Sequence, residues 1–150
     1  MILYALYAIT FILLAYIPRN KLKEASLIFL FQLFVTWFLG LLTVELRLIE
    51  YPVREFSHVN RTSFLYEFLL YPVLSIFFCL YYPKNRKWPI QLLYIILFSA
   101  GLTLPEVIIE KNTHLIHYIH WKWYFSWLSI SCTLFLTWLF YKWFYKLFDQ

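Results

Sequence analysis

The sequence predicts an all-α protein, an integral membrane bundle of about five transmembrane helices. Its 150 residues are 63% hydrophobic and 24% aromatic but only 14% charged. A soluble domain is nearer to about 25% charged, so most of this surface is expected to face lipid. Apolar runs close to about 20 residues, the length that crosses a bilayer as a helix, recur along the chain. They favour a membrane protein over the core of an obligate soluble complex, and residues 1–150 are expected to form one domain.

Short polar or basic segments separate the predicted spans. Pro52 ends the second span, because proline lacks an N–H and disfavours helix at the residue before it. Pro72 is expected to kink the third span. The predicted spans cover residues 2–17, 25–48, 63–82, 90–110 and 122–146.

The fourth span depends on whether the helix continues through Pro105. Residues 90–104 alone give only about 22 Å of helix, which is short for a hydrocarbon core of about 30 Å. Continuing to Glu110 gives about 31 Å, so we expect a Pro-kinked helix that ends around 111–113, followed by a short interfacial piece at 114–120. In the alternative, Thr103–Glu106 is a capping box that starts a separate surface helix.

Lysine and arginine predict the orientation of the spans. The turns at 18–24 and 83–88 and the C-terminal end hold eight of the 13 basic residues, against five on the other side. With the carboxylates included, the net charges of the two sides are +6 and −1. Because positively charged loops stay in the cytoplasm, we expect an external N-terminus and a cytoplasmic C-terminus in the cell membrane.

Ionisable groups gather toward the predicted outer helix ends. Glu106, Glu110 and His114 recur every four residues, and on an unbroken helix Thr113, His117, His120 and Trp121 would fall with them in an arc of about 120°. Such clusters beside membrane-length apolar segments indicate a functional site. The predicted outward-facing polar pocket consists of Glu50, Arg54, Glu67, Glu106, Glu110, His114 and His117.

Glu67 lies inside an apolar run, where a carboxylate needs a partner or water. Arg54 or Arg61 is the nearest expected partner. Arg54 is also expected to reach Glu50, Glu106 or Glu110, and in the plainest interpretation these pairs only tie the outer helix ends together.

Two chemical sites are weaker alternatives. Glu110, His114 and His117 could hold a divalent metal, since carboxylate and imidazole are common ligands, although no His-Glu-x-x-His pattern is present. Glu50-Tyr-Pro-Val-Arg54 has a faint similarity to the glutamate and arginine motif of intramembrane CAAX-type proteases, but the second glutamate is missing.

Serine-nucleophile, glycine-rich phosphate-loop and Cys-x-x-Cys patterns are absent from the sequence. No cofactor is therefore predicted, and an enzyme is not the favoured class.

Three motifs carry a resemblance to a family: Tyr51-Pro-Val-Arg54, Phe68-Leu-Leu-Tyr-Pro72, and Glu106-Val-Ile-Ile-Glu-Lys-Asn-Thr-His-Leu-Ile-His-Tyr118 with Trp121-Lys-Trp-Tyr124. Over about residues 45–140 the chain resembles a family of small, uncharacterised polytopic membrane proteins from Gram-positive, mostly spore-forming bacteria. The resemblance implies fold and location but no activity. Positions 117 and 120 vary in that family, which favours Glu106, Glu110, Tyr51 and Arg54 over a histidine metal site.

Two functions follow as hypotheses. The first is an interaction or assembly subunit, packed in the lipid bilayer against another membrane protein or a second copy of itself. The second is a small transporter or ion-binding protein, which the intramembrane Glu67 favours. Nucleic acid is not expected as a partner, because the basic residues are divided among short turns.

Overall fold

The computed structural model describes residues 2–54, 58–59 and 61–148. Within them the fold is all-helical apart from two short strands. The α-helices are α1 (Ile2–Ala15), α2 (Leu22–Glu45), α3 (Tyr71–Leu80), α4 (Trp88–Asn112) and α5 (Trp123–Phe148); the others are the 3₁₀ turn η1 (Arg19–Lys21) and the π-helix η2 (Leu65–Leu70). The strands are β1 (Ile49–Glu50) and β2 (His117–Tyr118).

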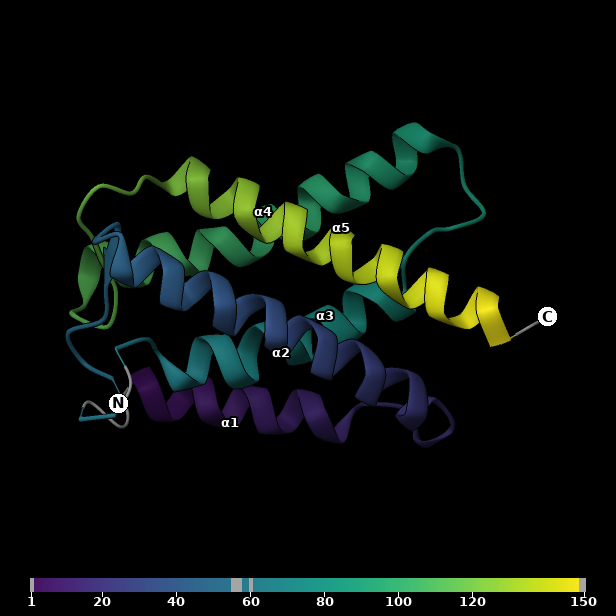
Figure 1. The fold of residues 1–150 in the computed structure, drawn as a ribbon, viewed down its shortest axis with the longest axis horizontal. Helices are drawn as coiled ribbons and strands as arrows, with labels where there is room; N and C mark the ends of the chain where they lie inside the picture. The colour runs from purple at the N-terminus through teal and green to yellow at the C-terminus, as the bar shows by residue number, and fades with distance from the viewer. Residues whose placement is uncertain (1, 55–57, 60, 149–150) are drawn as a thin grey trace.

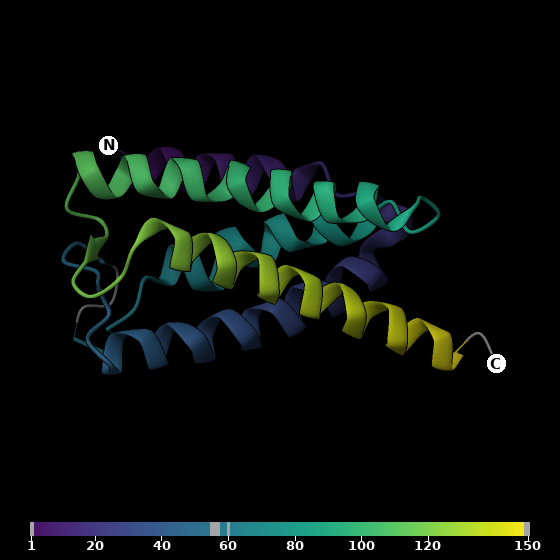
Figure 2. The same ribbon diagram turned by 90° about the horizontal axis from the view of Figure 1, so that it is seen from above.

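The helices run up and down along one direction (Figures 1 and 2). The N-terminus, β1 and β2 lie at one end, which we name the strand end. The turn containing η1, the turn at 83–87 and the C-terminal part of α5 lie at the opposite end, which we name the basic end. The basic turns identified in the sequence therefore fall together at one end of the bundle.

Three helical segments are long and apolar enough to cross a membrane. They are Arg19–Glu45, Trp88–Asn112 and Trp123–Lys146, with mean hydropathies of 2.3, 2.1 and 1.3 over their most apolar windows. Ile2–Ala15 and Leu65–Leu80 are apolar but shorter. Length and composition thus indicate a membrane protein.

The helix α4 continues through Pro105 to Asn112, as the length argument predicts. The capping-box alternative is wrong, because Thr103 lies inside the helix and its hydroxyl donates to the Ser99 carbonyl at 2.9 Å. At the end of α4 the Thr113 hydroxyl accepts from the Leu115 N–H at 3.2 Å and donates to the Ile109 carbonyl at 2.7 Å. These side-chain bonds satisfy groups that a helix end leaves unpaired.

The helix α4 ends at Asn112, within the predicted range of 111–113, so the arc that an unbroken helix would give to residues 106–121 does not form. Residues 117–118 form β2, which pairs antiparallel with β1 through Ile49↔Tyr118 and Glu50↔His117. The second helix ends at Glu45, before the predicted end at residue 48. Arg47 turns the chain there with a left-handed φ of 54°, and the chain then enters β1. The strand pairing satisfies backbone groups that two helix ends would leave open.

Two apolar clusters hold the bundle. One lies between α2, α3 and α5 and contains Ile28, Ile76, Phe78, Leu134 and Trp138. The other surrounds the strands and contains Ile49, Tyr51, Tyr66, Leu115 and Ile116. Residues of both clusters line the cavity described below, which places that cavity between them.

Pro72 changes the helix before it. In the π-helical register of η2, the Tyr71 N–H bonds the Tyr66 carbonyl five residues back. The next donor would be Pro72, which has no N–H, so the Glu67 carbonyl loses its helical partner. The Thr36 hydroxyl on α2 donates to that carbonyl at 2.8 Å. The expected kink at Pro72 is therefore a π-helical turn that ties α2 to the segment carrying Glu67.

Candidate functional site

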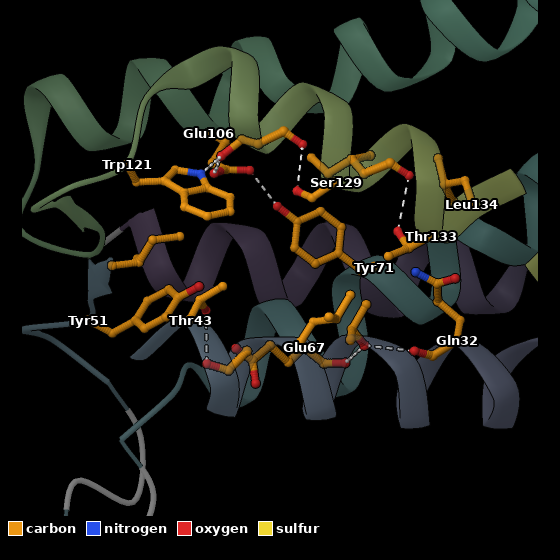
Figure 3. A pocket seen from close by; sticks show the side chains of 16 residues that line it. Gln32, Thr43, Tyr51, Glu67, Tyr71, Glu106, Trp121, Ser129, Thr133 and Leu134 are labelled. Carbon is orange, nitrogen blue, oxygen red and sulfur yellow. Dashed lines mark hydrogen bonds between the residues drawn. The ribbon is translucent and has the colours of Figure 1, made fainter. Parts of the chain in front are cut away.

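The site is a cavity of about 150 Å³ between α2, α5 and the segments that carry Glu67 and Glu106 (Figure 3). At about 30 Å³ of liquid volume per molecule, it has room for a few waters or a small ligand. Its lining residues are Gln32, Thr36, Leu39, Gly40, Thr43, Ile49, Tyr51, Glu67, Tyr71, Glu106, Trp121, Ser126, Ser129, Ile130, Thr133 and Leu134.

Three hydroxyl groups hold the buried Glu106 carboxylate. Tyr71 donates to Oε2 at 2.6 Å, while Tyr118 and Ser126 donate to Oε1 at 2.5 and 2.7 Å. These donors come from α3, β2 and α5, and Glu106 itself lies on α4. Hydrogen bonds to a charged acceptor are stronger than neutral ones, so this carboxylate joins four elements and is satisfied without a cation.

The β1–β2 pairing positions Tyr118. Successive strand residues face opposite sides, and Tyr118 points inward to Glu106 whereas His117 is exposed. Burial and the Glu106 charge raise the pKa of Tyr118 well above its usual value, so its hydroxyl keeps the proton that it donates. The Trp121 indole N–H donates to the Ser126 hydroxyl at 2.8 Å, which orients Ser126 toward the same carboxylate.

Glu67 is held in a different way. It is 3% exposed, and neither carboxylate oxygen has a hydrogen-bond partner within the described chain. The Thr62 side chain lies near enough to act on this carboxylate. A buried carboxylate in this state must carry its proton or meet a positive charge.

Gly40 on α2 makes the room for Glu67. A Cβ atom at position 40 would lie 1.8 Å from Glu67 Oε1 and 2.2 Å from its Cδ, which is far inside contact distance. Any other residue would displace the carboxylate. The absence of a side chain at this helix position therefore lets the carboxylate pack directly against α2.

Four serine and threonine hydroxyl groups that line the cavity can act as hydrogen-bond acceptors toward it. Each donates its hydrogen to a backbone carbonyl: Thr36 to Glu67, Thr43 to Gly40, Ser129 to Ser126 and Thr133 to Ile130, at 2.8 to 3.1 Å. A hydroxyl has one hydrogen to donate. The remaining lone pairs of all four side chains are therefore available to the cavity.

Two donors also line the cavity, at its two ends. The Gln32 amide lies toward the basic end, and its Oε1 accepts from Thr137 at 2.5 Å. The Tyr51 hydroxyl lies toward the strand end. Burial, together with the Glu67 and Glu106 charges, raises the pKa of Tyr51 well above its usual value, so it stays a neutral phenol. Lysine, arginine and histidine are absent from the lining in the described residues.

Only part of the predicted polar pocket comes together. Glu67 and Glu106 both line the cavity, on either side of Tyr71 in Figure 3. Glu50, His114 and His117 are exposed instead, and Glu110 is half-buried outside the lining. These side chains separate because the chain leaves the helix at Asn112 and alternates along β2.

The expected pairing of Arg54 with Glu67 is also wrong. Arg54 Nη1 donates to the Tyr51 carbonyl at 2.7 Å, while the Glu67 oxygens have no hydrogen-bond donor in the described chain. Arg61 lies 3.9 Å from Glu45 at the exposed surface. The arginines therefore serve the loops between the helices.

The suggested metal ligands Glu110, His114 and His117 do not form a centre. Across the described residues no three histidine, cysteine, aspartate or glutamate side chains come together in a group that could hold a metal ion.

Sequence reasoning missed the hydroxyl and amide groups of the site. Ser126, Gln32 and Gly40 stand in apolar segments where single polar or small residues form no pattern. Tyr71 and Tyr118 belong to the quoted motifs, but nothing in the sequence assigned their hydroxyl groups to Glu106. The one available signal was scarcity: the chain has only two glycines, and Gly40 lies in the middle of a predicted span.

Comparisons with family models, curated proteins and solved structures find no match. The resemblance to small polytopic membrane proteins of Gram-positive bacteria therefore stays a prediction.

The Gly40–Glu67 contact gives a prediction. Gly40→Ala should lower the melting temperature of the detergent-solubilised protein, because the new methyl group occupies the carboxylate position; overpacking costs about 1–3 kcal/mol. Gly101→Ala on α4 is the matched control, since its Cβ meets nothing within 4 Å. It should leave stability unchanged or raise it by up to about 1 kcal/mol through helix propensity. Equal effects of the two substitutions would contradict the contact.

The Glu106 network gives a second prediction. Tyr118→Phe should destabilise the protein by about 1.5–3 kcal/mol, the usual range for a hydrogen bond to a charged group. Tyr124→Phe at an exposed neighbouring position should be close to neutral. Urea or thermal unfolding of both variants checks this, and a neutral Tyr118→Phe would mean that the network does not stabilise the fold.

Proposed function

We propose that this chain is a five-span protein of the cell membrane, with its N-terminus outside and its C-terminus in the cytoplasm. The two shorter apolar helices lie beside the three long ones, between the same two ends, and successive helices along the chain alternate in direction. The basic turns and the C-terminal end lie together at the basic end. Positively charged ends face the cytoplasm, which supports this orientation.

We propose further that the cavity binds a small monovalent cation at Glu67. The observation that carries this is the Glu67 carboxylate, buried and without a hydrogen-bond partner among the described residues, in a cavity rich in oxygen acceptors. Hard cations take carboxylate, hydroxyl and carbonyl oxygens as ligands. The hypothesis of an ion-binding or transport protein is therefore preferred.

The charge of the site favours a single positive charge. Glu106 already receives three hydroxyl donors, so its charge is stabilised by the protein. Of the two carboxylates that line the cavity, Glu67 is the one without a hydrogen-bond donor among the described residues. A divalent ion would bring more charge than this site leaves open, whereas a proton and a monovalent cation are natural competitors for one carboxylate.

The other hypotheses find less support. The Glu50–Arg54 segment of the intramembrane-hydrolase alternative has Glu50 at the surface and Arg54 on a backbone carbonyl, so it forms no acid pair with the cavity. A role as an assembly subunit, beside another membrane protein or a second copy, stays a prediction, since no contact described above favours it.

The topology is checked with reporter fusions. Fusions after Asn20, Arg86 and Gln150 should be cytoplasmic, and those after His58 and Asn112 should be external. The turns at 18–24 and 83–88 and the C-terminal end carry a net charge of +6, and positively charged segments stay in the cytoplasm. An external C-terminus would contradict the five-span arrangement.

Cation binding is checked by melting of the purified protein in lithium, sodium or potassium chloride, with N-methylglucamine chloride at equal ionic strength as the reference. At least one small cation should raise the melting temperature at alkaline pH. A cation at a concentration of 100 times its Kd would stabilise the folded protein by about 2.7 kcal/mol. The shift should shrink at acidic pH, because the proton then occupies Glu67. The ionisable groups near this carboxylate are the Tyr51, Tyr66 and Tyr71 phenols and Glu106.

Variants assign the effect to the site. Glu67→Gln should abolish the cation shift, while the exposed Glu45→Gln, which loses only its 3.9 Å contact with Arg61, should keep it. The proposal fails if no cation changes the melting temperature, or if Glu67→Gln responds like the wild type.

A further inference from the structure

Polar pairs continue from the cavity toward the basic end along the interface between α2 and α5. The Thr137 hydroxyl on α5 donates to Gln32 Oε1 on α2 at 2.5 Å, and both residues are almost fully buried. Nearer the basic end, the Tyr141 hydroxyl donates to Glu24 Oε2. Gln32 also lines the cavity that contains Glu67. One helix interface therefore connects the two carboxylates through a buried amide and hydroxyl.

The two polar pairs lie at different depths along the length of the bundle. Glu24 and Gln32 are eight residues apart on α2, about 12 Å of helix, and Thr137 and Tyr141 are one turn apart on α5. The fully buried Ile28 lies between Glu24 and Gln32. In this structure an apolar layer of about two turns thus separates the cavity from the Glu24–Tyr141 pair.

Buried polar groups inside a membrane are costly and mark ion pathways when they face the bundle interior. They also hold helices together, because amide and hydroxyl side chains bond across helix interfaces. The position of the Gln32–Thr137 bond favours the first role, an ion pathway. The bond lies between the cavity that contains Glu67 and the Glu24 carboxylate at the basic end.

We propose that the protein moves the monovalent cation between the Glu67 cavity and the Glu24–Tyr141 pair, with the Gln32–Thr137 bond as the inner gate. This rests on the proposed function, since it takes the Glu67 site as its outer station. When the gate bond opens, Thr137 can donate to a carbonyl of its own helix, as Ser131 does to Trp127 at 2.7 Å. The Gln32 carbonyl oxygen is then free to accept the cation.

The exchange balances charge at Glu67. A cation that leaves the carboxylate toward the basic end is replaced by a proton that enters from the basic end, and the next cation from the cavity side displaces that proton outward. One cation therefore moves against one proton, with no net charge left in the bundle. At the basic end the Glu24 carboxylate accepts from Lys21 at 2.7 Å and from Tyr141, so it can take the cation only in exchange for the lysine contact.

The test is transport by the full chain reconstituted in liposomes that contain a pH-sensitive dye. A pulse of sodium, potassium or lithium chloride, each in turn, should drive protons in the opposite direction for the cation that raises the melting temperature. Thr137→Val should raise the initial rate about tenfold, because the lost hydrogen bond no longer holds the gate closed, and keep the cation-dependent melting shift. Thr137→Ser, which retains the hydroxyl, should transport at close to the wild-type rate.

A matched control separates the gate from general packing. Thr103→Val on α4 removes another buried hydroxyl, one that bonds only its own helix, and should transport at the wild-type rate. A wild-type or lower rate in Thr137→Val, or equal gains in the Val and Ser variants, would overturn the gate. A melting shift without proton movement in the wild type would overturn transport but keep the binding site. Neither shift nor movement would overturn both proposals.

Discussion

The fold at the strand end depends on satisfying one buried carboxylate. Glu106 lies on a helix long and apolar enough to cross a membrane, where an ion without partners is costly. Its three donors come from α3, β2 and α5. Each donor sets a requirement on its own element: Tyr118 must stand on a strand that turns it inward, and Ser126 must lie in the first turn of α5 beside Trp121. The two-residue strands are therefore more than a connection, because their pairing delivers one of the groups that stabilise the charge.

Glu67 shows the opposite arrangement in the same cavity. Its backbone carbonyl is satisfied by Thr36, because Pro72 removes the helical donor, and its side chain packs against Gly40. The backbone is thus fixed while the carboxylate has no hydrogen-bond donor among the described residues. Two glutamates in one site therefore differ through their surroundings: Glu106 accepts three hydrogen bonds, and Glu67 accepts none within the described chain. This division underlies the proposed binding of a single monovalent cation.

The sequence predicted the parts of the fold that depend on many residues. Long apolar runs located the helices, and the length of a membrane crossing predicted that α4 continues through Pro105. The end of α4 at Asn112 agrees with the predicted break, but the pairing of 117–118 with β1 was not predicted, because two residues in each strand are too few to form a pattern. The arginine partner for Glu67 was wrong, because a buried carboxylate has solutions besides an ion pair, as the three hydroxyl donors of Glu106 illustrate. Single tyrosines, serines and glycines inside apolar helices gave no periodic signal.

The distribution of charge indicates the direction in which a cation approaches the site. In the proposed orientation, the segments at the strand end carry a net charge of −1 and those at the basic end carry +6. Two of the carboxylates at the strand end, Glu67 and Glu106, are buried in the cavity, and without them the segments at that end carry a net charge of +1. A cation is therefore repelled less strongly at the outer end than at the inner one. The cavity extends over the half of α2 nearer the strand end, from Gln32 to Thr43. Its acceptors therefore lie on the less positive side, while the apolar layer around Ile28 and the Gln32–Thr137 bond lie between the cavity and the strongly positive end. Electrostatics and packing thus act in the same direction: they favour entry to Glu67 from outside and make passage past Gln32 the controlled step.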